Sequence, residues 1–183
     1  GGFYNGHCRA LGLTAEGCAA RLRQHNPVYH FEDELQGHIA VPAALAEEDF
    51  IVRRRDGLYA YNLAVVVDDM DSGITEIVRG ADLLEPTVRQ IALYQTLGAD
   101  VPAWVHLPLA VLADGNKLSK QNHAPALAQD DVRPALWQAL TFLGQCPPPC
   151  LRENTVDEII AWGIAHWQLA RVPRQQKIVL GAR

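Results

Sequence analysis

Long apolar runs are absent from this sequence of 183 residues. No window approaches the roughly 18 uncharged apolar residues that a membrane-spanning helix requires. The chain begins Gly-Gly-Phe-Tyr, without a methionine and without the pattern of a signal peptide. We therefore expect a soluble, cytoplasmic protein with no membrane partner, whose sequence is truncated or processed at its N-terminus.

Cysteine is also scarce, and the four that are present do not form the framework of a secreted, disulfide-rich protein. We expect reduced thiols at Cys8, Cys18, Cys146 and Cys150. Cys146 and Cys150 enclose three prolines and have no histidine pair nearby, so a stiff linker explains them better than a zinc site.

An excess of positive charge is missing as well, because the formal net charge is -5. This sign argues against non-specific nucleic-acid binding by the whole surface and limits any RNA contact to a local basic patch. Solvated surface charge is the more common role of basic residues. The candidates for a contact with RNA phosphates are Arg53, Arg54, Arg55, Arg171, Arg174, Lys177 and Arg183.

The residues that are present support a globular core, with 49% hydrophobic and 20% charged side chains. The polar N-terminal part predicts a helix over residues 14–24 and two short strands over residues 28–31 and 37–41. A small inserted or peripheral module fits this pattern.

An α/β pattern follows. Residues 58–67 are nearly continuously apolar, which is typical of a parallel strand covered on both faces. A strand over residues 74–80, an amphipathic helix over 85–97 that stops at Gly98, and a strand over 104–112 have the order of a crossover in a parallel sheet. Two further helices are expected over residues 130–143 and 155–169, joined by the proline linker. The predicted division is residues 1–56, 57–115 and 116–183.

A short polar segment, Lys117-Leu118-Ser119-Lys120, carries the strongest chemical signal. Two ammonium groups and a hydroxyl in one loop suit a polyphosphate, because a lysine can neutralise charge on departing pyrophosphate. The segment resembles the KMSKS signature of class I aminoacyl-tRNA synthetases. Alone, this tetrapeptide is a weak signal, so the flanking sequence decides its meaning.

Four ordered blocks, at residues 56–69, 73–84, 86–91 and 117–125, resemble the glutamyl-tRNA synthetase group. The first reads Asp-Gly-Leu-Tyr-Ala-Tyr-Asn-Leu-Ala-Val-Val-Val-Asp-Asp, and the last reads Lys-Leu-Ser-Lys-Gln-Asn-His-Ala-Pro. Within that group the likeness is to the glutamyl-Q tRNA(Asp) synthetases, a short branch without an anticodon-binding domain. The resemblance implies the second half of a Rossmann-type (HUP) parallel sheet, preceded by the inserted module and followed by a helical subdomain similar to a stem-contact fold.

The implied activity is activation of L-glutamate by ATP, accompanied by Mg²⁺, to glutamyl-adenylate. The implied transfer places glutamate on queuosine in the anticodon of tRNA(Asp), and the implied state is a monomer. Tyr61 and Arg79 match the residues that bind L-glutamate in this group. The chemistry agrees, because a guanidinium can hold a carboxylate through two hydrogen bonds while a phenol adds a third. We expect both at the ends of parallel strands, where such sheets bind ligands. The alternative is a buried tyrosine beside a surface ion pair of Arg79 with Glu76 or Asp82.

Lys120 matches the lysine that contacts ATP, and Lys117 and Ser119 complete the catalytic loop. The alternative is a solvated turn. Asp68, Asp69 and Asp71 could be read as a magnesium cluster, but we expect a structural turn. His106 and His123 are expected to be scaffold residues, because an ionised carboxylate needs no general base to attack ATP.

Tyr4 and Cys8 match the second half of the zinc site of this group, whose first half is an upstream C-x-C pair. A structural zinc ion needs four ligands, so an unoccupied half-site is the alternative.

The HIGH-like motif of class I synthetases is also missing, and the resemblance places it upstream. The rival functions are an ordinary glutamyl-tRNA synthetase fragment that charges tRNA(Glu) and a catalytically inactive RNA-binding fragment. The sequence after Lys120 is too short for an anticodon-binding domain of roughly 100 residues, which favours the short branch.

Overall fold

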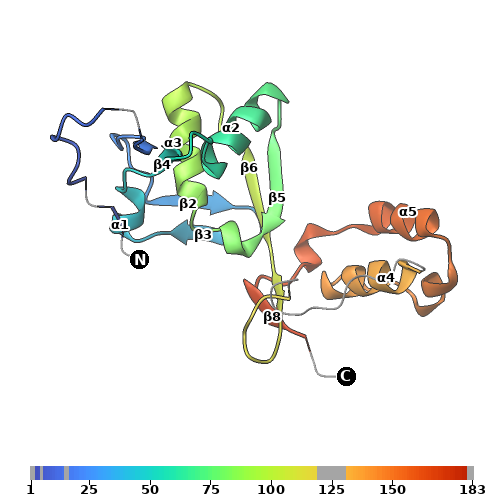
Figure 1. The fold of residues 1–183 in the computed structure, drawn as a ribbon. Coiled ribbons are helices and arrows are strands. Elements are labelled where there is room, and N and C mark those ends of the chain that lie inside the picture. Colours follow the sequence, from blue (N-terminus) through green and yellow to red (C-terminus); the bar gives the residue numbers. More distant parts are fainter. Residues whose placement is uncertain (1–2, 5, 15–16, 119–130, 181–183) are drawn as a thin grey trace. The chain divides into compact units, whose positions relative to one another are not determined.

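The computed structural model describes residues 3–180 except 5, 15–16 and 119–130 (Figure 1). The chain divides into two compact units. Unit 1 comprises Gly1–Arg79 and Leu83–Val105, and unit 2 comprises Gly80–Asp82 and His106–Arg183. The described strands form four two-stranded sheets, so the architecture is mixed α/β with small sheets.

Unit 1 begins with a short antiparallel pair, in which β1 (Ala20–Arg21) lies beside β4 (Ile51–Arg53). The predicted helix over residues 14–24 is therefore wrong for the described part of that segment. The backbone N–H of Leu22 donates to the carbonyl of Phe50 at 3.0 Å, which extends the pairing. Bonding to a distant strand thus overrides the local helical pattern.

The two expected strands that follow are confirmed, with β2 (His30–Asp33) antiparallel to β3 (Gly37–Ala40). The Asp33 carboxylate closes the turn between them, because its Oδ1 accepts the backbone N–H groups of Leu35 at 3.1 Å and Gln36 at 2.8 Å. A single helical turn, α1 (Ala43–Ala46), leads from β3 toward β4.

The apolar run over residues 58–67 forms a helix and not the expected strand. Helix α2 (Tyr61–Asp71) begins at Tyr61 and contains most of that run. Leu63, Val66 and Met70 pack in the core of unit 1, and their spacing of three and four residues is that of one helical face. The continuous apolar pattern concealed this periodicity, because the exposed face also carries valine and alanine.

The expected strand, helix and strand order after α2 is confirmed by β5 (Glu76–Gly80), α3 (Thr87–Leu97) and β6 (Ala103–Leu107), with β5 and β6 as paired neighbours. A short 3₁₀ turn, η1 (Ala81–Leu83), lies between β5 and α3. Helix α3 ends at Gly98, whose φ of 71° is the left-handed conformation that closes helices. Helices α2 and α3 pack beside each other (Figure 1).

Unit 2 contains a parallel pair of strands, β7 (Leu109–Val111) and β8 (Lys177–Val179). Pro108 separates β7 from β6, so the predicted strand over residues 104–112 is divided in two. Proline lacks the N–H group that a continuous ladder needs, which accounts for the break.

Helices α4 (Arg133–Phe142) and α5 (Val156–His166) confirm the two helices expected in the C-terminal part. Two 3₁₀ turns, η3 (Pro149–Glu153) and η4 (Leu169–Arg171), precede and follow α5. Over the described ranges, no helix has the length and apolarity needed to cross a membrane.

Helix α4 ends in a tight turn at Gly144 and Gln145. Gly144 has a φ of 72°, and the backbone N–H of Gln145 returns to Leu140 O at 2.9 Å. The buried Gln145 side chain donates to Leu143 O at 2.7 Å and accepts the Gln168 N–H at 2.8 Å. This side chain therefore connects the end of α4 to the segment that follows α5.

We predict that Gly144→Ala lowers the stability of unit 2 by about 2–4 kcal/mol, through left-handed backbone strain and overpacking. A Cβ atom at this position would lie 2.3 Å from Arg171 O, which leaves no room for it. Gly115→Ala is the matched control, because Gly115 also has a positive φ of 81° but no atom within 4 Å of its Cβ position. Urea denaturation checks the difference, and equal losses in the two variants would contradict the steric argument.

Candidate functional site

Strand β5 and helix α3 together hold Arg79 in one orientation. Arg79 Nη1 donates to Gln90 Oε1 at 2.7 Å, and Nη2 donates to Thr87 Oγ1 at 2.7 Å and to Leu83 O at 3.3 Å. The guanidinium also lies over the Trp104 ring, 4.9 Å from its centroid. Thr87 and Gln90 are fully buried while Arg79 is half-buried. The guanidinium plane is thus determined before any ligand arrives.

The same network reaches the start of α2. Gln90 Nε2 donates to Asn62 Oδ1 at 3.1 Å, and Asn62 follows Tyr61 in the first turn of that helix. The predicted position of Tyr61 at a strand end is wrong, because Tyr61 begins a helix. Its side chain is 54% exposed, and it makes no hydrogen bond within the described part of the chain. The prediction that Arg79 lies near a strand end is confirmed, since β5 ends one residue later at Gly80.

Sequence reasoning did not identify four residues of the Arg79 network: Gln90, Thr87, Asn62 and Trp104. Thr87 and Gln90 are three residues apart on the face of α3 that also buries Val88 and Ile91. Two polar side chains on an otherwise apolar helix face require hydrogen-bond partners when buried. This pattern was the available signal that α3 holds a polar group from another element.

Lys117 is the first residue of the predicted lysine loop, residues 117–120, and it lines a small cavity of unit 2 of about 280 Å³. Lys117 Nζ forms an ion pair with Asp82 Oδ2 at 2.7 Å, and both residues line that cavity. The backbone N–H of Leu118 donates to Ala110 O at 2.9 Å, which attaches the loop to β7. Ser119 and Lys120 lie outside the described residues. Asp82, one of the two acids considered as partners of Arg79, pairs with Lys117.

Tyr4 and Cys8, the two predicted zinc ligands, lie next to each other. The backbone N–H of Cys8 donates to Tyr4 Oη at 2.9 Å. Hydrogen bonding with the Cys8 side chain, with a smaller effect of burial, raises the pKa of Tyr4 above its usual value. Among the residues that the structure describes, no group of three or more His, Cys, Asp or Glu side chains could hold a metal ion. The two donors fit part of a metal site but do not complete one.

The remaining candidates lie in scaffold positions or outside the described ranges. Asp68, Asp69 and Asp71 are in the last turn of α2, where the carbonyls of Asp68 and Asp69 accept the N–H groups of the following turn. His106 is fully buried in β6. His123 lies outside the described residues.

Asp49 is the most buried acid near Tyr4 and Cys8. Its side chain is 3% exposed and accepts Arg9 Nε and Nη2 at 2.6 Å each, together with the Gln24 N–H at 2.9 Å. The hydrogen bonds from Arg9 are the main reason that the pKa of Asp49 is lowered. Because Arg9, Gln24 and Asp49 come from separate segments, this carboxylate fixes the N-terminal part of unit 1.

Comparison with known proteins identifies the class to which this architecture belongs. The family described as tRNA synthetases class I (E and Q), catalytic domain, matches residues 12–160. The chain therefore belongs to this family.

The curated relatives carry a more specific name. The chain is 61% identical over 180 residues to the glutamyl-Q tRNA(Asp) synthetase of Serratia proteamaculans (strain 568), covering 98% of this chain and 59% of that protein. It is 58% identical over 178 residues to the protein of the same name from Pectobacterium atrosepticum, covering 97% of this chain and 55% of that protein. The chain thus spans somewhat more than half the length of these relatives.

Solved structures support the fold. The glutamate-tRNA synthetase from Elizabethkingia anophelis matches with a TM-score of 0.68 at 21% identity, over 98% of this chain and 43% of that chain. The glutamate tRNA ligase from Elizabethkingia meningosepticum, determined in complex with its amino acid, matches with a TM-score of 0.63. A class I glutamate-tRNA synthetase-like fold is therefore shown.

We predict that Asp49 makes stability depend on pH. Its lowered folded-state pKa means that its contribution is complete above the unfolded value of about 3.9 and is lost as pH falls through the folded value. Asp49→Asn should cost about 1–3 kcal/mol near neutral pH, because Arg9 and the Gln24 N–H lose a buried, charged acceptor. The measurement is urea denaturation of both proteins between neutral and acidic pH. A difference between them that does not shrink below about pH 4 would contradict the assignment.

Proposed function

We propose that this chain supplies the second half of the Rossmann-type (HUP) catalytic domain of an enzyme that activates L-glutamate with ATP. The product is glutamyl-adenylate, and glutamate then passes to queuosine in the anticodon of tRNA(Asp). The names of relatives at 56–61% identity support this substrate pair and favour it over ordinary charging of tRNA(Glu). The observation that carries the proposal is the locked guanidinium of Arg79, which suits an acidic amino acid.

In the activation step, an oxygen of the glutamate α-carboxylate attacks the α-phosphorus of ATP. A new carboxyl-phosphate bond forms, the bond between the α-phosphorus and the bridging oxygen breaks, and pyrophosphate leaves with the electron pair. No general base is needed, because the carboxylate is ionised at neutral pH. Positioning of the two reactants and neutralisation of the leaving charge then determine the rate.

Arg79 and Tyr61 orient glutamate in this proposal. The guanidinium holds a substrate carboxylate by charge-assisted hydrogen bonds, and the Tyr61 phenol adds a directional one. Gln90 and Thr87 hold Arg79 without charge, so its positive charge is not cancelled by α3. Neither of these two contacts neutralises the guanidinium.

Lys120, with Lys117 and Ser119, acts on the phosphates of ATP, whose accompanying Mg²⁺ supplies further positive charge. Tyr4 and Cys8 would provide two ligands of a structural zinc ion in the full-length enzyme, with the others supplied by residues outside this chain. Residues 1–56 form the inserted module, 57–115 the half-sheet and 116–183 the loop with the helical subdomain. The full enzyme acts as a monomer.

We predict that Arg79→Ala lowers kcat/KM for glutamate by about 10- to 100-fold, the range expected for losing charged hydrogen bonds. Glutamate-dependent exchange between pyrophosphate and ATP, measured on the full-length protein, reports this step without RNA. Arg174→Ala is the matched control, since Arg174 is an exposed arginine of unit 2. Full exchange activity in Arg79→Ala would refute the assigned role.

Gln90→Glu tests whether the charge of Arg79 matters apart from its position. The new carboxylate keeps the shape of the side chain but competes with the substrate for the guanidinium, so KM for glutamate should rise about 10-fold. KM for ATP should stay the same. Gln138→Glu adds the same charge at an exposed position of α4 and serves as the control. An unchanged KM for glutamate in Gln90→Glu would argue against carboxylate binding by Arg79.

A further inference from the structure

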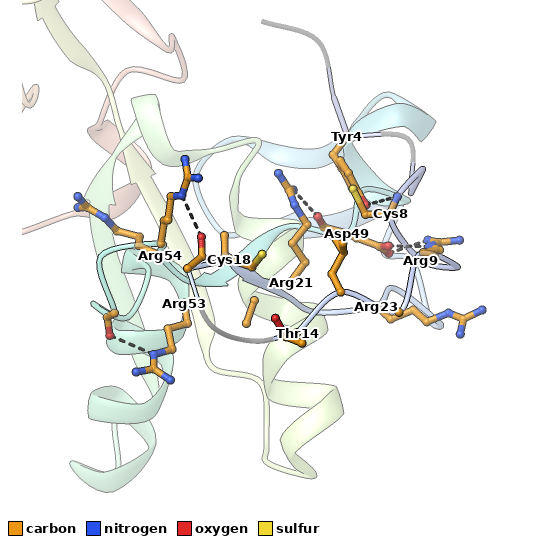
Figure 2. Close-up of a pocket in the computed structure, with 17 residues that line it drawn as sticks. Tyr4, Cys8, Arg9, Thr14, Cys18, Arg21, Arg23, Asp49, Arg53 and Arg54 are labelled. Atoms are coloured by element: carbon orange, nitrogen blue, oxygen red, sulfur yellow. Dashed lines mark hydrogen bonds and ion pairs between the residues drawn. The ribbon is translucent and has the colours of Figure 1, made fainter.

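A large cavity of unit 1, about 780 Å³, is lined by arginines (Figure 2). The lining includes one aspartate, Asp49, and six arginines from three segments of the chain: Arg9, Arg21, Arg23, Arg53, Arg54 and Arg55. The whole chain has a net charge of -5, so this concentration of positive charge is local. The Arg79 network makes no contribution to this lining.

The arginines of this cavity have different partners. Arg9 is occupied by Asp49 through two hydrogen bonds, and Arg54 forms an ion pair with Asp56 at 2.6 Å. The other four, Arg21, Arg23, Arg53 and Arg55, form no ion pair with an acid in the described part of the chain. Arg23 interacts electrostatically with Asp49, so Arg21, Arg53 and Arg55 are the arginines of this cavity without an acidic partner among the described residues.

Backbone carbonyls orient these three guanidinium groups. Arg53 Nε donates to Gly57 O at 3.1 Å, and Arg55 Nε donates to Gly17 O at 2.9 Å. Arg21 Nη1 donates to Asp49 O at 2.7 Å, and its guanidinium lies 4.0 Å from the centroid of the Tyr4 ring. Arg53 and Arg55 use only Nε in these bonds, which leaves their Nη groups to donate to phosphate oxygens.

We propose that this cavity binds the phosphodiester backbone of the RNA substrate, with Arg53 and Arg55 as the principal contacts. The inference rests on the proposed function, since a member of a tRNA synthetase family must hold a polyanion. The cavity volume exceeds that of a single phosphate, and Arg53 and Arg54 lie on the opposite side of it from Arg9 and Arg23, so a strand that crosses it meets arginines at both ends (Figure 2). Contacts of this kind position RNA without reading its sequence.

The test measures binding of a fluorescein-labelled RNA hairpin, with the sequence of the tRNA(Asp) anticodon stem-loop, by fluorescence anisotropy on the full-length protein. Arg53→Ala and Arg55→Ala should each weaken binding about 5- to 10-fold at 0.1 M salt. Arg54→Ala/Asp56→Ala is the matched control from the same loop and should weaken binding less than 2-fold, because it removes an arginine together with its ion-pair partner and leaves the net charge unchanged. Equal effects in all three variants would overturn the inference in favour of general charge attraction.

Salt dependence and competition provide independent readouts. The double variant Arg53→Ala/Arg55→Ala should reduce the slope of log Kd against log salt by about 1–2, the value expected for two lost phosphate contacts. The double variant should lose the same factor of affinity for a hairpin of scrambled sequence, because phosphate contacts do not read sequence. An unchanged slope overturns the inference, as does displacement of the hairpin by poly-L-glutamate at an equal concentration of charge, which would indicate an acidic protein partner.

Pyrophosphate exchange separates this inference from the proposed function. The double variant should retain exchange at the wild-type rate, which also shows that it folds. Hairpin binding unaffected by the double variant, with exchange intact, overturns the cavity assignment alone. A wild-type protein without exchange overturns the proposed activity, while a binding loss confined to Arg53 and Arg55 still supports the cavity.

Discussion

The attachment of Arg79 to helix α3 is the constraint on which the candidate site depends. Thr87 and Gln90 are buried, and a buried polar group without a partner costs free energy comparable to a lost hydrogen bond. Arg79 forms hydrogen bonds with both of them. The same bonds therefore stabilise the packing of α3 beside β5 and fix the orientation of the guanidinium. Gln90 extends the same network to α2 through Asn62, and a change in any member would move the others.

The arginines of unit 1 have two different kinds of surroundings. Around Arg79, neutral amide, hydroxyl and carbonyl groups support a single charge, which suits one small carboxylate. Around the arginine cavity, Asp49 neutralises Arg9 and orders the surrounding segments, while other arginines keep their charge. Because the chain has a net charge of -5, the arginine cavity is a local concentration of positive charge.

Sequence reasoning succeeded where the signals are local. The strands β2 and β3, helix α3 with its terminal Gly98, and helices α4 and α5 follow from periodicity and from turn residues. It failed over residues 14–24, where bonding to the β4 segment decides the structure, and over residues 58–67, where uniform apolarity hid a helical face. The resemblance indicated Arg79 but not its partners on α3, because a sequence does not show which distant polar groups meet.

The ion pair between Lys117 and Asp82 has a consequence for how the lysine loop could work. Both side chains are about half exposed, and exposed ion pairs contribute little to stability. Asp82 is thus a replaceable counterion, which occupies Lys117 while no stronger anion is near. In the proposed reaction, the triphosphate of ATP carries more charge than one carboxylate and takes over this lysine, while β7 and β8 keep their pairing.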